Sequence, residues 1–143
     1  MLIQSETQKR KKKVLFVESD PLEAWQFQEI FKKYAKDEFQ VIHESSLVDA
    51  LRRLSEDGMD LVLLDTDLPE GRGLTNLVRV LLNHPKTPVI VLTELKDEAV
   101  ALQALRCGAE DYVIKDDVVD REALIRISRY SIERHRYYVK GHY

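Results

Sequence analysis

A single cysteine, Cys107, stands in a chain of 143 residues that also has only 5 glycines and 4 prolines. One cysteine forms no intrachain disulfide, so the fold must depend on a hydrophobic core, as is usual in a reducing compartment. The scarcity of glycine and proline excludes collagen-like and low-complexity chains. Long hydrophobic runs are absent too, because the longest, at 61–64 and 89–92, fall far short of the ~18 residues that span a bilayer. We therefore expect one cytoplasmic domain with no membrane association.

Charge is unevenly distributed along the chain, although the formal net charge is only -3. Basic residues fill positions 9–13 and outnumber acids from Arg121 onward, whereas acids outnumber basic residues between these two ends. An acidic body lacks the clustered cationic face that phosphate backbones require, so we expect no nucleic-acid binding by this domain. Residues 1–13 are interpreted as a solvated basic tail.

Short apolar segments alternate with segments of helical periodicity, and the alternation repeats five times. Strands are expected at 14–17, 39–42, 61–64, 89–92 and 112–114. Helices are expected to begin at Pro21, Ser46, Leu74, Asp97 and Asp120, the last one running to about Tyr138. At the first helix, Asp20, Pro21 and Glu23 form the pattern of an N-cap, a proline at the first position and an acid three residues after the cap.

The connections between the strands are too long for hairpins, so the strands must be parallel. Right-handed crossovers with helices on both faces then predict an α/β fold, a doubly wound (βα)5 five-stranded parallel sheet of order 2-1-3-4-5. The domain is expected to cover residues 14–136, and residues 137–143 are expected to be a tail or the start of a linker.

Polar side chains follow every central strand of this predicted sheet. The carboxyl ends of the strands carry Glu18, Ser19, Asp20, Asp65, Asp67, Thr93 and Lys115. In an open parallel sheet these ends meet in one crevice. Clustered carboxylates need a cation, which Lys115 or a hard divalent ion such as Mg²⁺ supplies. A carboxylate, an ammonium group and a hydroxyl together suit a transferring phosphoryl group, with Asp65 as the nucleophile that forms an acyl phosphate.

These residues carry a family resemblance. The segments 63–69, 91–93 and 108–115, together with Gly73, resemble the signature segments of the response-regulator receiver domain of two-component signal transduction. The resemblance implies a flavodoxin-like fold and a signalling module rather than an enzyme, limited to self-catalysed phosphotransfer and autodephosphorylation. It makes Asp65 the phosphoacceptor, phosphorylated by a histidine kinase or a phosphotransfer protein, and Lys115 the lysine that contacts the phosphoryl group.

The resemblance also implies a switch and a metal site. Thr93 would be the switch hydroxyl and Tyr112 the switch aromatic, which together repack the surface of the helix at 97–106, the strand at 112–114 and the last helix. A Mg²⁺ ion would be bound by Glu18, Asp65 and the backbone carbonyl of Asp67, and Ser19 and Asp20 are further candidate ligands.

The sequence departs from the family pattern at three positions. Ser19 stands where the family has a second metal-binding acid, which predicts weaker Mg²⁺ binding. Glu94 replaces a small residue after the switch hydroxyl, and Asp116 replaces the proline after Lys115. These departures leave open a degenerate receiver that binds partners without phosphorylation. A haloacid-dehalogenase-type phosphatase is a further alternative, because 65–67 also resembles its nucleophile motif, although that motif normally ends the first strand of the sheet.

The last helix is longer than the sheet requires. Its continuation from Arg129 to Tyr138 is expected to project, where it would pair with a second copy of the chain or lead into an output domain. A frayed amphipathic tail is the alternative.

Overall fold

The computed structural model describes residues 10–117 and 121–139. Most of the basic tail, the expected cap Asp120 and the last four residues lie outside this part. In chain order the elements are β1 (Lys12–Val17), α2 (Pro21–Ala35), β2 (Phe39–Glu44), α3 (Leu47–Glu56), β3 (Leu61–Leu64), β4 (Asp67–Leu68), β5 (Gly71–Arg72), α4 (Leu74–Asn83), β6 (Val89–Thr93), α5 (Glu98–Cys107), β7 (Asp111–Ile114), the 3₁₀ helix η1 (Lys115–Asp117) and α6 (Arg121–Val139).

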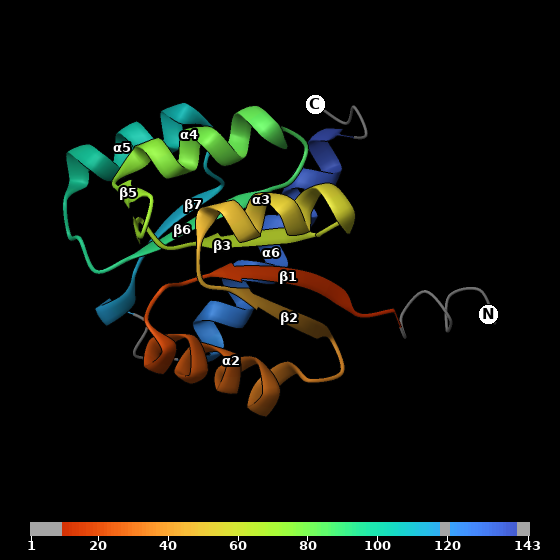
Figure 1. Ribbon diagram of the computed structural model, residues 1–143. Helices are drawn as coiled ribbons and strands as arrows, with labels where there is room; N and C mark the ends of the chain where they lie inside the picture. Colours follow the sequence, from red (N-terminus) through yellow and green to blue (C-terminus); the bar gives the residue numbers. More distant parts are fainter. Residues whose placement is uncertain (1–9, 118–120, 140–143) are drawn as a thin grey trace.

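The main sheet has the order β2-β1-β3-β6-β7, and all neighbouring strands are parallel. This confirms the predicted order 2-1-3-4-5. Helices α3, α4 and α5 cover one face of the sheet, and α2 and α6 cover the other (Figure 1). The short antiparallel hairpin of β4 and β5 was not predicted, because two-residue strands leave no periodic signal in the sequence.

Each strand of the centre is apolar on both sides because helices cover both faces. In β1, Val14 and Phe16 pack into the core with α2 and α6. Leu15 and Val17 pack into the opposite core with α3 and α4. The four residues of β3, the central strand of the sheet, are fully buried.

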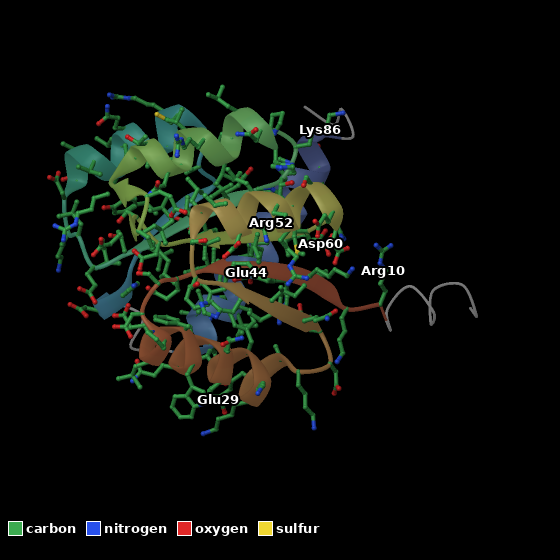
Figure 2. All side chains as sticks on the ribbon, in the orientation of Figure 1. Arg10, Glu29, Glu44, Arg52, Asp60 and Lys86 are labelled. Carbon is green, nitrogen blue, oxygen red and sulfur yellow. The ribbon has the colours of Figure 1, made fainter. Side chains whose placement is uncertain are left out.

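The parallel strands begin at one edge and end at the opposite edge. Arg10, Asp60 and Lys86 precede β1, β3 and β6, and Figure 2 shows all three at the same end of the molecule. The loops that follow the strands therefore gather at the other end, where the predicted site residues are located. Among the described residues, no helix is long and apolar enough to cross a membrane.

Helix α6 does not project from Arg129, so that prediction is wrong as far as Arg136. Ile132 is buried, and the Arg129 guanidinium donates to both Glu38 carboxylate oxygens at 2.7 Å. Arg136 lies 3.4 Å from Asp60. The buried apolar residues of α6 thus continue as far as Ile132, and Arg129 and Arg136 pair with acids of the body.

Strand β1 also begins earlier than the predicted Val14. Lys12 and Lys13 already pair with β2, and the Lys13 ammonium lies 2.9 Å from Asp57. Lysines at the start of this strand are tolerated because their long side chains reach acids at the rim of the sheet.

Candidate functional site

An acidic pocket of about 700 Å³ lies at the carboxyl edge of the sheet. Its lining includes every predicted site residue: Glu18, Ser19, Asp20, Asp65, Asp67, Thr93, Tyr112 and Lys115. Glu23, Thr66, Arg72 and Glu94 line it as well. The structure thus brings together side chains from four strand ends, as the parallel topology predicts.

The Lys115 ammonium group lies among three carboxylates. Its Nζ is 2.6 Å from Oε1 of Glu18, 2.7 Å from Oε2 of Glu23 and 2.9 Å from Oδ2 of Asp65. An ammonium group has three donors, so all of them are used. The Lys115 side chain is only 6% exposed, and those of Glu18 and Asp65 are 1% and 7% exposed. A buried ion cluster of this kind exchanges little with water and is electrostatically strong.

The buried cluster shifts the pKa values of its members. Burial is the largest influence on Lys115 and would lower its pKa, but hydrogen bonds to Glu18, Glu23 and Asp65 raise the pKa above its ordinary value. Burial raises the pKa of Glu18 to about 8, and its hydrogen bond with Asp65 contributes in the same direction. Glu18 therefore holds its proton to a higher pH than a carboxyl group in water does, which relieves the repulsion among the carboxylates.

Glu18 is held in place by contacts with Asp20 and His43. Its Oε2 accepts a hydrogen bond from the Asp20 N–H at 3.1 Å, and its carbonyl oxygen lies 2.7 Å from Nε2 of His43. Asp20 itself caps α2, because its Oδ1 accepts from the Leu22 N–H at 2.9 Å. The predicted N-cap is confirmed, and it directs the first turn of α2 toward the pocket.

Glu23 is the site residue that the sequence analysis missed. An acid three residues after an N-cap typically accepts from the N–H of the cap residue, but here Glu18 accepts from the Asp20 N–H and Glu23 binds Lys115 instead. Burial would raise the pKa of Glu23, but its hydrogen bond from Lys115 and other contacts lower it below the ordinary value. One signal could have found it: the first turn of a helix after β1 starts at the carboxyl edge, where its side chains reach the crevice.

The loop after β3 holds Asp65 and Asp67 in a defined geometry. Oδ1 of Asp65 accepts from the Asp67 N–H at 2.9 Å. The buried Asn76 side chain donates to the carbonyl oxygens of Thr66 at 3.3 Å and of Gly71 at 2.8 Å. These bonds connect α4 to both sides of the β4–β5 hairpin.

The Asp67 carbonyl oxygen, a predicted metal ligand, accepts a hydrogen bond from Oγ of Ser19 at 3.1 Å. The Asp67 carboxylate is exposed and lies 3.2 Å from Nε of the exposed Arg72. The Ser19 side chain and the Asp67 backbone therefore offer a cation only a hydroxyl and a carbonyl oxygen, and neither atom carries a charge.

Thr93 and Tyr112 both bind the segment that follows β6. The Thr93 hydroxyl is buried, lies 3.0 Å from the Thr66 hydroxyl and accepts from the Leu95 N–H at 3.1 Å. The Tyr112 hydroxyl donates to the Leu95 carbonyl oxygen at 2.8 Å. Leu95 thus connects the predicted switch hydroxyl with the predicted switch aromatic.

The other two sequence departures are also at this edge. Glu94 is exposed at the pocket rim, and a hydrogen bond with Glu23 raises its pKa. Asp116 is exposed in η1, and no peptide bond among the described residues is cis.

The donor atoms suit a hard divalent cation. One oxygen from each of Glu18, Glu23 and Asp65 lies within 4.8 Å of the others. Carboxylate and carbonyl oxygens are the ligands that Mg²⁺ uses in proteins, usually with several waters retained. The residues present therefore fit Mg²⁺, in competition with the Lys115 ammonium group.

Residues 14–128 match the family model of the response regulator receiver domain. The regulatory protein YhcZ of Bacillus subtilis is 35% identical over 82 residues, which are 57% of this chain and 38% of YhcZ. The chemotaxis protein CheY of Listeria monocytogenes is 29% identical over 104 residues, which are 70% of this chain and 87% of CheY. This chain thus aligns with less than half of YhcZ but with most of CheY.

Solved structures show the same fold. A CheY-like receiver domain protein of Methanospirillum hungatei superposes with a TM-score of 0.76 at 19% sequence identity. The superposition covers 89% of this chain and 98% of the other chain.

Proposed function

Because this chain belongs to the response regulator receiver family of two-component signalling, we propose that it accepts a phosphoryl group on Asp65 from a histidine kinase or a phosphotransfer protein. One observation carries the proposal: a buried aspartate at the carboxyl end of the central strand lies 2.9 Å from a buried lysine ammonium group. A nucleophile and a fixed positive charge side by side are what in-line phosphoryl transfer requires.

The chemistry is a displacement at phosphorus. One carboxylate oxygen of Asp65 forms a bond to phosphorus while the P–N bond of a phosphohistidine breaks. The imidazole leaves with the electron pair and takes up a proton, and Asp65 becomes an acyl phosphate. The Lys115 ammonium group stabilises the negative charge on the phosphoryl oxygens.

Bound Mg²⁺ would supply further positive charge to the phosphoryl oxygens. Glu18, Asp65 and the Asp67 carbonyl oxygen are the ligands that the family resemblance proposes, and all three line the pocket. The protein's own part is to hold Asp65 by the Asp67 N–H and Lys115.

Output would follow from Thr93 and Tyr112. We expect the Thr93 hydroxyl to leave Thr66 and Leu95 for the phosphoryl oxygens, which removes one of the contacts that position Leu95. The surface of α5, β7 and α6 would then repack and pass the signal to an output domain or to a second copy of the chain.

The test uses the whole chain with Mg²⁺ and acetyl phosphate. Intact-mass spectrometry should show the mass of one added phosphoryl group, labile in alkali, and Asp65→Asn should show none. Asp116→Asn, which changes an exposed carboxylate at the same edge of the sheet, should still form the adduct. No adduct at any Mg²⁺ concentration would overturn the proposal and favour a receiver that acts by binding alone.

Steady turnover of a phosphomonoester would instead favour a phosphatase. Such an enzyme needs a further strand after the lysine, and in the described part of the chain only η1 and α6 follow Lys115.

A further inference from the structure

The three carboxylates around Lys115 differ in how freely they can move. The Glu23 side chain is 23% exposed, against 1% for Glu18 and 7% for Asp65. The Glu18 carboxylate also accepts a hydrogen bond from the backbone. Glu23 is therefore the carboxylate of the cluster that an entering ion meets first, and it can turn without moving a strand.

At the position of Ser19 the pocket offers an ion no charge. Ser19 contributes a neutral hydroxyl, which already donates to the Asp67 carbonyl oxygen at 3.1 Å. When Glu18 and Asp65 are both ionised, their two negative charges and the positive charge of Lys115 leave one negative charge in excess. Glu23 adds the second excess charge, which matches a divalent cation.

We propose that Glu23 is a direct ligand of the divalent cation in this pocket and replaces the carboxylate that Ser19 does not provide. The inference rests on the phosphoacceptor function proposed above. It requires Glu23 to exchange its contact with Lys115 for one with the cation. The released ammonium donor is then available to a phosphoryl oxygen, so the same exchange prepares Lys115 for phosphoryl transfer.

Direct binding of Mn²⁺ to the unphosphorylated chain tests the role of Glu23. Electron paramagnetic resonance of free Mn²⁺ and calorimetry should show that Glu23→Gln weakens binding by about tenfold or more, as expected for loss of a charged ligand. The matched control is Glu94→Gln, which removes an exposed acid of the same pocket. It should weaken binding by about threefold or less, because the Glu94 carboxylate is exposed and is not one of the clustered oxygens that could bind the ion.

The substitution Ser19→Asp tests whether Glu23 binds the cation directly or only adds negative charge near it. If Glu23 compensates for Ser19, the loss caused by Glu23→Gln should fall to about threefold or less in the Ser19→Asp background, since the new carboxylate satisfies the ion. Glu23→Asp keeps the charge but shortens the side chain, so it should weaken binding in the Ser19 chain even if Glu23→Gln does not fold.

Three results would overturn the inference: no Mn²⁺ binding by the unaltered chain, a loss in Glu23→Gln no larger than in Glu94→Gln, or the same loss with and without Ser19→Asp. Phosphorylation is measured separately with acetyl phosphate. Failure to phosphorylate Asp65, with Mn²⁺ binding as expected, would overturn the proposed function and leave Glu23 as a ligand.

Discussion

The Nζ atom of Lys115 lies 2.9 Å from Oδ2 of Asp65, although 50 residues separate the two in the chain. The contact joins the end of β7 to the end of β3 across β6, which lies between them in the sheet. It also explains why Glu18 and Asp65 can be buried beside apolar strands, because the positive charge of the ammonium group offsets the negative charges of the carboxylates.

Removal of the Lys115 charge should destabilise the protein. Lys115→Met leaves three carboxylates without a cation, and breaking a buried ion pair in this way costs about 3–5 kcal/mol. The isolated carboxylates then have raised pKa values in the folded state, so the loss should be larger at pH 8 than at pH 5. Urea unfolding at both pH values measures it. Lys32→Met removes an exposed lysine and should change stability little, and an equally small effect of Lys115→Met would contradict the prediction.

Glu18 should make the stability of the metal-free protein depend on pH. Its pKa is raised from 4.5 to about 8 in the folded state, so the folded protein binds more protons than the unfolded chain between these values. The contribution of Glu18 is fully present below pH 4.5 and is lost as the pH rises through about 8. Within that window it should reduce the free energy of unfolding by about 1.4 kcal/mol per pH unit.

Glu18→Gln should remove this slope. Glu29→Gln is the control, since Figure 2 shows Glu29 on the outer side of α2 and Glu29 does not line the pocket. Denaturant unfolding of the three proteins in a metal chelator, from pH 5 to pH 8, makes the comparison. Parallel curves for the unaltered chain and Glu18→Gln would show that Glu18 does not hold its proton.

Asn76 should be important both for stability and for the site. Asn76→Ala removes the donor of two loop carbonyl oxygens, which should cost about 2 kcal/mol. It should also slow adduct formation on Asp65, because the loop that holds Asp65 loosens. Asn83→Ala, at an exposed position of the same helix, should affect neither. Normal adduct kinetics in Asn76→Ala would mean that the loop is held by its other contacts.

Phosphorylation should break the hydrogen bond from Tyr112 to Leu95. Movement of Thr93 toward the phosphoryl group withdraws its acceptor from the Leu95 N–H, so the Leu95 carbonyl oxygen should shift as well. Fluorine NMR of the chain containing 3-fluorotyrosine follows this, with the Tyr112 signal assigned from Tyr112→Phe. The Tyr112 signal should move on addition of Mg²⁺ and acetyl phosphate, while that of Tyr34 on α2 stays. A fixed Tyr112 signal in a sample that carries the adduct would contradict the switch.

The pocket could be predicted where a residue's position follows from the end of a strand. Glu18, Asp65, Thr93 and Lys115 each end or follow a buried strand, so parallel topology alone brings them to one edge. Glu23 could not be assigned in this way. Its spacing from Asp20 fits a capping interaction as well as a site role, and only the three-dimensional competition between Glu18 and Glu23 for the Asp20 N–H decides between them.

The sequence by itself determined the five strands, their parallel order and the edge at which the predicted site residues gather. Hydrophobic periodicity and the lengths of the connections can be read from residues that are neighbours in the chain. Only the tertiary structure decided that Lys115 binds three carboxylates, that the Ser19 hydroxyl binds the Asp67 carbonyl oxygen and that α6 stays on the body as far as Arg136. Those features depend on distances between side chains far apart in the chain. Such distances are set by the packing of the whole core rather than by any local pattern.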